Sequence, residues 1–279
     1  MITATKHMVR KVFRAAGFEL LHRTPDPVLH MLRAAHERLR FIPSREPSWD
    51  HTLGEIHFSA HLRRLLVRHE IDLVIDIGAN TGQYGRLLRE LGYRGEICSF
   101  EPEPNNFSQL QQAAVTDRAW RVYPVALGNA AAEVDLYVAT NGVFNSLHPS
   151  SPYGRAAFPS DLSLRKTVRV PIRRLDQLWK ELTRSDCRRV LLKSDTQGHD
   201  LAVLQGGARS LQKCSVVQVE AAFCSIYDGI PGYRSSFDLL EASGFQIGGI
   251  FPLSTEDHSL ALIEADVLFV RASSAQPGA

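Results

Sequence analysis

Short apolar runs alternate with helical patterns from residue 71 toward the end of the chain. The first run, residues 71–77 (I-D-L-V-I-D-I), is typical of a strand that is buried on both faces of a parallel sheet. Apolar spacing predicts strands over 71–77, 95–100, 120–127, 189–194 and 216–220, and helices over 55–68, 83–91, 105–115, 200–211 and 235–242. This alternation predicts an α/β fold with a mostly parallel, doubly wound sheet.

Two further features interrupt or end this alternation. Residues 134–139 and 167–172 predict extra strands on either side of a loop over 140–166, which is rich in Ser, Pro and Gly. A loop of this length in a domain is usually functional or disordered. Residues 245–251 and 266–270 are separated by a polar segment and predict a terminal antiparallel hairpin.

The beginning of the chain has a different pattern. Apolar residues at helical spacing predict helices over 8–21 and 28–39, and prolines and polar residues near 43–47 indicate a linker. We therefore predict a basic helical N-terminal extension over 1–48 and one α/β domain over 49–279.

The loop after the first core strand carries the strongest chemical signal. It reads V-I-D-I-G-A-N-T-G-Q-Y from Val74 to Tyr84, at the sheet edge where ligands bind in open α/β folds. Gly78 and Gly82 allow a tight turn with no Cβ in the way. A dinucleotide fingerprint needs G-x-G-x-x-G, whereas this loop offers only G-x-x-x-G, and Asp76 would repel a pyrophosphate.

A cationic ligand is compatible with Asp76. S-adenosylmethionine is such a ligand, with a sulfonium, an ammonium and no phosphate. The second strand ends in C-S-F-E-P, which places Glu101 where an acidic residue can accept both ribose hydroxyls. Together, Asp76, the paired glycines and Glu101 predict an S-adenosylmethionine site.

The motifs continue in order along the chain. They are V-I-D-I-G-A-N-T-G-Q-Y, S-F-E-P-E-P-N-N-F, Y-P-V-A-L-G and L-L-K-S-D-T-Q-G-H-D-L-A-V-L-Q-G-G-A. Over residues 71–271 the chain resembles the FkbM-type family of S-adenosylmethionine-dependent methyltransferases. The resemblance implies a Rossmann-like class I methyltransferase fold and O-methylation of hydroxyls on sugars, polyketides or related natural products. It also implies cofactor contacts at the methionine end from Asp76, Gly78, Asn80 and Gly82, at the ribose from Glu101, and near the adenine from Ala126 and Leu127. Ser194 and His199 depart from the family pattern, so the resemblance transfers no detailed substrate.

A second polar group follows the fourth and fifth core strands. Asp195 comes directly after the strand over 189–194, and Glu220 ends the next one, so both can reach a shared ligand. Methyl transfer to a hydroxyl needs an aligned oxygen and a group that takes its proton. Asp195 can orient the acceptor, or hold a divalent cation such as Mg²⁺ with Glu220. His199 is a candidate general base, because an unperturbed histidine has a pKa of about 6.5.

The alternative interpretation is that Asp195 caps the following helix and His199 is solvated in its first turn. Two carboxylates are too few to establish a metal site, so metal dependence stays open. Weaker candidates for acceptor contact are residues 145–148 (N-S-L-H), Tyr227 and Asp228. His57 and His61 lie at i, i+4 spacing without a third ligand nearby and indicate a helix surface.

Composition refines the picture of partners. The formal net charge is +2, but residues 1–45 hold nine basic and three acidic residues, which leaves −4 for the remainder. An acidic domain disfavours a nucleic-acid substrate. The basic extension is expected to act as a lid, or to contact an anionic membrane surface peripherally. The four cysteines form no C-x-x-C pair, and we find no membrane-spanning run or secretory leader, so we expect a cytoplasmic protein.

The sequence therefore predicts an O-methyltransferase acting on a hydroxyl of a sugar, a glycolipid or another natural product. Methylation of an amine or a carboxyl group stays open as an alternative, because the cofactor loop says nothing about the acceptor. A catalytically silent cofactor-binding scaffold is the alternative outside enzymes. The sequence does not specify the oligomeric state.

Overall fold

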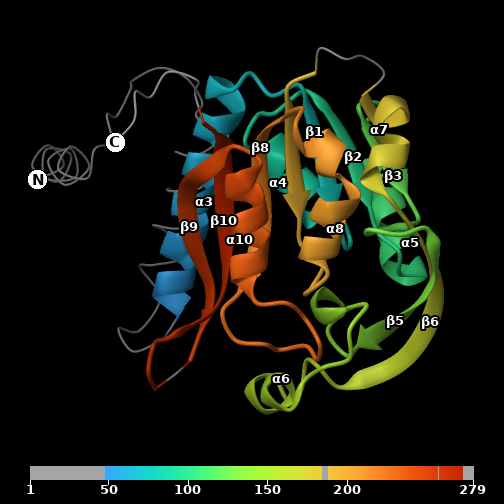
Figure 1. The fold of residues 1–279 in the computed structure, drawn as a ribbon, viewed down its shortest axis with the longest axis vertical. Coiled ribbons are helices and arrows are strands. Elements are labelled where there is room, and N and C mark those ends of the chain that lie inside the picture. Colours follow the sequence, from blue (N-terminus) through green and yellow to red (C-terminus); the bar gives the residue numbers. More distant parts are fainter. Residues whose placement is uncertain (1–47, 184–187, 257, 273–279) are drawn as a thin grey trace, which may run out of the picture. The chain divides into compact units, whose positions relative to one another are not determined.

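A computed structural model describes residues 48–183, 188–256 and 258–272 of the chain. These residues form a seven-stranded sheet between two layers of helices, with a three-stranded sheet at one end (Figure 1). The predicted helices over 8–21 and 28–39 lie outside the described residues, as does the basic extension except for Ser48.

The large sheet has the strand order β3-β2-β1-β7-β8-β10-β9. The strands are β1 (Leu73–Ile77), β2 (Glu96–Phe100), β3 (Trp120–Tyr123), β7 (Val190–Ser194), β8 (Cys214–Ala222), β9 (Phe245–Thr255) and β10 (Leu262–Arg271). Neighbours from β3 to β8 pair in parallel, whereas β10 pairs antiparallel with both β8 and β9. The doubly wound α/β fold and the terminal hairpin are therefore confirmed.

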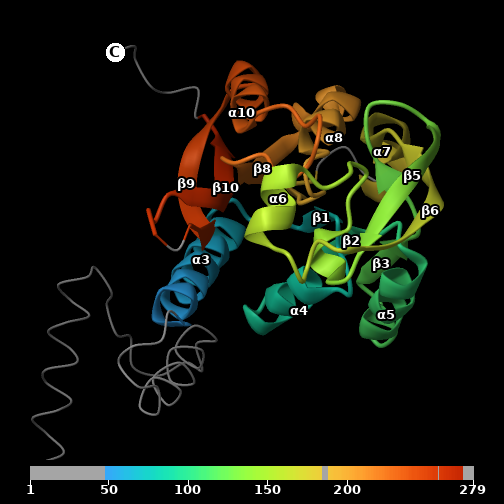
Figure 2. The same ribbon diagram turned by 90° about the horizontal axis from the view of Figure 1, so that it is seen from below.

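Helices cover both faces of this sheet, as Figure 2 shows from one end. One face carries α3 (Ser48–Arg68), α4 (Gln83–Glu90) and α5 (Pro104–Ala114), and the other carries α7 (Leu175–Thr183), α8 (Asp200–Gly206) and α10 (Tyr233–Ala242). The helix predicted over 200–211 is interrupted, and its second part is α9 (Ala208–Leu211), which packs against α7. The close approach of Gly206 to the Gly128 carbonyl leaves no room for a Cβ at that point.

The core lies between the central strands and these helices. All five residues of β1 are buried, and Leu73, Ile75 and Ile77 join the main apolar cluster with residues of β7 and β8. Burying each such aliphatic side chain contributes roughly 1.5–3 kcal/mol, so the first predicted strand anchors the fold. Among the described helices, none is both long and apolar enough to cross a membrane.

The small sheet has the order β4-β6-β5, with β4 (Ala126–Leu127), β5 (Ala132–Ala139) and β6 (Leu164–Arg173). It corrects the single strand predicted over 120–127: β3 ends at Tyr123, and β4 belongs to the other sheet. Pro124, between them, has no N–H to donate to a ladder. The long predicted loop is partly ordered as a 3₁₀ turn (Gly142–Phe144) and α6 (Pro152–Ala157). Figure 1 shows α6 and the small sheet at the end of the large sheet where β1 and β7 finish.

Candidate active site

The loop after β1 lies between the ends of β2 and β7. The amides of Gly78 and Ala79 donate to the Phe100 carbonyl at 3.0 and 2.9 Å, and the Asp195 amide donates to the Ile77 carbonyl at 3.0 Å. Gly78 has φ +77°, and a Cβ there would overlap the Asp195 carbonyl oxygen. Glycine is therefore required at position 78 both by its backbone conformation and by the close approach of Asp195, the residue after β7.

Asp76 is completely buried beneath this loop. Its Oδ1 lies 3.2 Å from Lys193 Nζ, and its Oδ2 accepts a hydrogen bond from Ser99 Oγ at 2.9 Å. Lys193 Nζ also donates to the Gly78 carbonyl at 3.0 Å and lies 3.4 Å from Asp195 Oδ2. Burial by itself lowers the pKa of Lys193, but the Asp195 and Asp76 carboxylates outweigh burial and raise it. The Lys193 ammonium thus links the cofactor loop to Asp195. Direct contact between Asp76 and a cofactor stays a prediction.

Glu101 lies at the tip of β2, as predicted, and is 5% exposed. Its Oε2 accepts from the Asn80 amide at 2.9 Å, and its Oε1 accepts from the Glu103 amide at 2.8 Å. Burial raises its pKa to about 7, although both backbone hydrogen bonds oppose this rise. Each oxygen keeps a lone pair that can accept a hydroxyl, which is what a ribose diol requires.

Asn106, Ala126 and Leu127 are further candidates for the cofactor site. Asn106, in the first turn of α5, has a buried Nδ2 without a hydrogen-bond partner, and this donor faces the region of Gly142. Sequence reasoning missed Asn106, although it lies in the S-F-E-P-E-P-N-N-F motif. Ala126 and Leu127 are buried in β4, where they pair with Ile172 and Arg173. Their expected place near the adenine stays a prediction.

The structure brings Asp195 and Glu220 to one group, the side-chain amide of Gln197. Gln197 Nε2 donates to Asp195 Oδ1 at 3.1 Å and lies 3.0 Å from both Glu220 oxygens. Desolvation, followed by the neighbouring Asp195 carboxylate, holds the pKa of Glu220 well above its ordinary value. Asp195 does not cap α8: Asp200 Oδ1 instead accepts from Ser194 Oγ at 2.5 Å and from the Thr196 amide at 3.2 Å.

His199 contacts another histidine rather than this amide. Its Nδ1 lies 3.1 Å from His148 Nε2, and its Nε2 is buried against Gly128 without a hydrogen-bond partner. Burial, followed by the neighbouring His148, lowers the pKa of His199 to about 4. The solvated position considered for His199 is therefore wrong, because the ring is mostly enclosed and paired.

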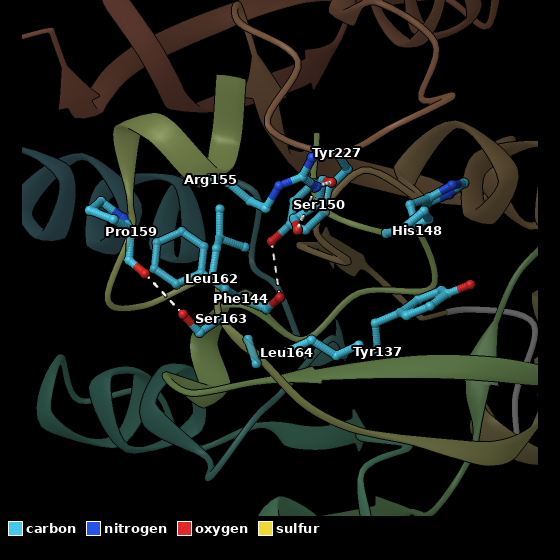
Figure 3. Close-up of a pocket in the computed structure, with 12 residues that line it drawn as sticks. Tyr137, Phe144, His148, Ser150, Arg155, Pro159, Leu162, Ser163, Leu164 and Tyr227 are labelled. Atoms are coloured by element: carbon cyan, nitrogen blue, oxygen red, sulfur yellow. Dashed lines mark hydrogen bonds between the residues drawn. The ribbon is translucent and has the colours of Figure 1, made fainter. Parts of the chain in front are cut away.

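A cavity of about 310 Å³ opens beside these residues (Figure 3). This volume is in the range of small-molecule sites. The long loop, β5 and the segment after β8 provide its walls, which consist of Tyr137, Ala139, Phe144, His148, Pro149, Ser150, Arg155, Pro159, Leu162, Ser163, Leu164 and Tyr227. Of the weaker candidates for acceptor contact, His148 and Tyr227 line this cavity, whereas Asp228 and residues 145–147 do not; contact with an acceptor stays a prediction. No acidic residue is among these lining residues.

Hydrogen bonds of Tyr227 in the cavity wall, and of the adjacent Ser146 and Gly142, attach this region to the rest of the site. Tyr227 Oη donates to Gln197 Oε1 at 2.7 Å, and Ser146 Oγ donates to the Gln197 carbonyl at 2.6 Å. Asn80 Nδ2 donates to the Gly142 carbonyl at 3.0 Å, so the cofactor loop also holds the wall. The cavity therefore adjoins both parts of the site that the sequence predicted: the cofactor loop after β1, and the pair Asp195 and Glu220.

Within residues 48–183, 188–256 and 258–272, no group of three or more His, Cys, Asp or Glu side chains converges in an arrangement that could hold a metal ion. His57 and His61 pack their rings against Phe251 on β9, at centroid distances of 5.1 and 5.4 Å.

Comparison with known proteins identifies the family to which the chain is similar. Residues 76–247 match the model of the methyltransferase FkbM domain. The chain is 25% identical over 201 residues to the 2-O-methyltransferase NoeI of Sinorhizobium fredii, which covers 66% of this chain and 76% of the relative.

Two solved structures are similar to the chain at lower sequence identity. Aeropyrum pernix fibrillarin with natively bound S-adenosyl-L-methionine has 13% identity and a TM-score of 0.41, over 71% of this chain and 66% of that one. Magnesium protoporphyrin IX methyltransferase from Synechocystis PCC 6803 has 11% identity and a TM-score of 0.42, over 90% of this chain and 100% of that one.

Proposed function

Because the chain belongs to the FkbM methyltransferase family and is an S-adenosylmethionine-dependent methyltransferase, we propose that it methylates a hydroxyl oxygen of a sugar, a glycolipid or another natural product. The observation that carries this proposal is the cavity beside Asp195 and Glu220, joined to them through Tyr227 and Gln197.

The residues around the β1 loop fit the cofactor. Glu101 would accept the ribose hydroxyls, Gly78, Asn80 and Gly82 would surround the methionine end, and Asn106 offers an unused amide donor. When bound, S-adenosylmethionine supplies an electrophilic methyl group on a positively charged sulfur. The protein then has to align the acceptor oxygen with that methyl group and provide a place for its proton.

The cavity favours a hydroxyl acceptor over an amine. An amine reaches the site mostly as an ammonium, and the one formally charged lining side chain is the guanidinium of Arg155. Neutral hydroxyl groups from Tyr137, Ser150 and Ser163 also line the cavity and can exchange hydrogen bonds with a polyol. The relative from Sinorhizobium fredii is a 2-O-methyltransferase, which supports an oxygen acceptor as well.

Aromatic and aliphatic side chains supply the remaining wall. Phe144, Leu162 and Leu164 can cover the apolar face of a sugar ring or the first part of a lipid chain. A cavity of about 310 Å³ is suited to one sugar unit rather than a long oligosaccharide. Asp195 and Glu220, through Gln197 and Tyr227, would orient the acceptor.

Labelled transfer tests this function. The purified full chain is incubated with S-adenosyl-[methyl-³H]methionine and a panel of p-nitrophenyl glycosides, in parallel with a glycolipid extract of the source organism. We expect base-stable label that is recovered in O-methyl sugars after acid hydrolysis. Label in a base-labile ester or in a cation-exchangeable amine would instead establish a carboxyl or amine acceptor. The matched control is the Asp195→Asn variant, which should bind the cofactor without transferring label.

A further inference from the structure

Two histidines that are 51 positions apart meet beside the cavity. His148 belongs to the wall formed by the long loop, and its backbone amide donates to Ser146 Oγ at 3.0 Å. His199 precedes the first turn of α8. Their rings face each other with His148 Nε2 and His199 Nδ1 3.1 Å apart and the ring centroids 5.3 Å apart.

This contact restricts where protons can lie. A hydrogen bond between two ring nitrogens needs one nitrogen with a proton and one without. If His148 Nε2 carries the shared proton, His199 Nδ1 accepts it and His148 Nδ1 keeps a lone pair. A further proton can then be added at His148 Nδ1 without breaking the contact. Protonating both rings would place two N–H groups against each other.

The two rings have different surroundings. His148 lines the cavity, whereas His199 Nε2 is buried against Gly128. Burial lowers the pKa of His148, and burial together with His148 lowers the pKa of His199 to about 4. Both rings are therefore neutral near pH 7, the state in which His148 can accept a proton.

The other titratable groups near the cavity are less suited to this task. Asp195 is engaged by Gln197 and lies beside the Lys193 ammonium. Desolvation favours the protonated form of Glu220, which cannot serve as a base. Tyr227 donates its proton to Gln197, and burial, followed by Glu220, raises its pKa. Tyr137 and Arg155 are the remaining titratable residues of the cavity wall, and a guanidinium stays protonated in proteins.

We propose that His148 takes the proton of the acceptor hydroxyl, and that His199 holds His148 in the tautomer able to do so. This inference rests on the proposed function. As the acceptor oxygen bonds to the methyl carbon, the bond from that carbon to sulfur breaks and its electron pair stays on sulfur. The hydroxyl proton passes to His148 Nδ1, and the ring later releases it to water. His148 is thus the catalytic residue and His199 a positioning residue.

The first test is kinetic and uses the full chain with whichever p-nitrophenyl glycoside or extract fraction the wild type methylates. His148→Gln should lower kcat about 10²–10⁴-fold and remove the acid limb of the pH profile, while the Kd for S-adenosylhomocysteine stays unchanged. His199→Gln keeps an oxygen that can accept from His148 Nε2 and should retain much of the activity. His199→Leu offers no acceptor and should lose most of it.

His69→Gln is the matched control, because His69 follows the end of α3 and its amide bonds within that helix end. This variant should keep the wild-type rate. Equal activity of His199→Gln and His199→Leu would overturn the positioning role. A normal kcat and acid limb in His148→Gln would overturn the catalytic role.

The second test needs no substrate. Nuclear magnetic resonance of ¹⁵N-histidine-labelled full chain should show His148 and His199 sharing one proton, with an apparent pKa below 6.5 for the pair. Independent titration of both rings near 6.5 would overturn the proposal even if methyl transfer is observed. If the wild type makes no O-methyl product, the proposed function and this inference fail together. If it does, and the His148 variant remains fully active, this inference fails alone.

Discussion

Lys193 and Asp76 form a buried ion pair at the centre of the sheet, with Nζ and Oδ1 3.2 Å apart. The register of the parallel strands β1 and β7 places these two residues directly opposite each other. Asp76 is fully buried and the Lys193 side chain is 6% exposed, so neither charge is compensated by water. The pair lies directly beneath the Gly78 carbonyl, and its geometry therefore sets the position of the cofactor loop.

The first prediction concerns this pair. Lys193→Met leaves Asp76 buried without its cation and should lower the free energy of unfolding by about 3–5 kcal/mol. Adding Asp76→Asn to that variant should recover a large part of the loss, because the uncompensated charge is removed. Urea denaturation of both variants measures the effect, with Lys180→Met on the exposed side of α7 as control. An equal loss in the single and double variants would show that packing, not charge, holds the site.

The second prediction is a pH dependence of cofactor binding. Burial raises the pKa of Glu101 to about 7, and the ionised carboxylate is the better acceptor for ribose hydroxyls. The affinity for S-adenosylhomocysteine should therefore rise about tenfold between pH 6 and pH 8. The raised pKa has the opposite consequence for folding. The stability that protonated Glu101 contributes is fully present below about pH 4.5, the ordinary pKa of a glutamate, and is lost as the pH rises through about 7.

Calorimetry of wild type and Glu101→Gln checks this. The variant should bind more weakly at pH 8 and show no rise over the same range. Glu90→Gln, on the exposed surface of α4, should behave like the wild type. A pH dependence that persists in Glu101→Gln would assign the titration to another group.

The sequence predicts the order of the fold well, because each central strand contains a short apolar run. Leu73, Ile75 and Ile77 show why: a strand buried on both faces cannot contain solvated positions, so its pattern is unambiguous. The strand predicted over 120–127 failed because apolar content does not reveal to which sheet a residue belongs. Helix α7 was missed, although Leu175, Leu178 and Leu182 follow helical spacing.

The site was predictable where its residues follow one another along the chain. Asp195 and Glu220 each follow the last register pair of the parallel strands β7 and β8, which is Ser194 with Val219, so their convergence follows from topology. The partnership of His148 with His199 depends on how the long loop folds back against the segment between β7 and α8, and no local spacing encodes it. Lys193 lies within an apolar strand, and its role becomes visible only through the register between β1 and β7.

The third prediction separates backbone strain from close packing. Gly78 and Gly229 both have positive φ, at +77° and +71°, but a Cβ would overlap the Asp195 carbonyl at Gly78 and meet nothing within 4 Å at Gly229. Gly229→Ala should therefore cost only the strain of about 1–2 kcal/mol. Gly78→Ala should cost more and should also weaken cofactor binding, because the loop must move away from the Asp195 carbonyl. Thermal unfolding and calorimetry compare the two, and equal effects would show that strain alone matters at Gly78.

The fourth prediction concerns Asp195. Asp195→Asn keeps the size of the side chain but removes the charge that Gln197 and Lys193 contact. The variant should fold and bind S-adenosylhomocysteine with an unchanged Kd, yet lose turnover, because the acceptor is no longer oriented. Circular dichroism, calorimetry and labelled transfer measure these properties separately. Normal turnover would limit Asp195 to holding the loop over 195–198 in place.

The fifth prediction is that wild-type activity survives dialysis against EDTA. Gln197 Nε2 lies between Asp195 and Glu220, 3.0–3.1 Å from both carboxylates. This nitrogen is a hydrogen-bond donor, whereas Mg²⁺ at that position would need oxygen ligands. Gln197→Glu replaces this donor with a third carboxylate and should create Mn²⁺ binding, measured by calorimetry, that the wild type lacks. Loss of wild-type activity in EDTA, with recovery on adding Mg²⁺ or Mn²⁺, would instead mean that Gln197 moves aside and that Asp195 and Glu220 hold a metal during catalysis.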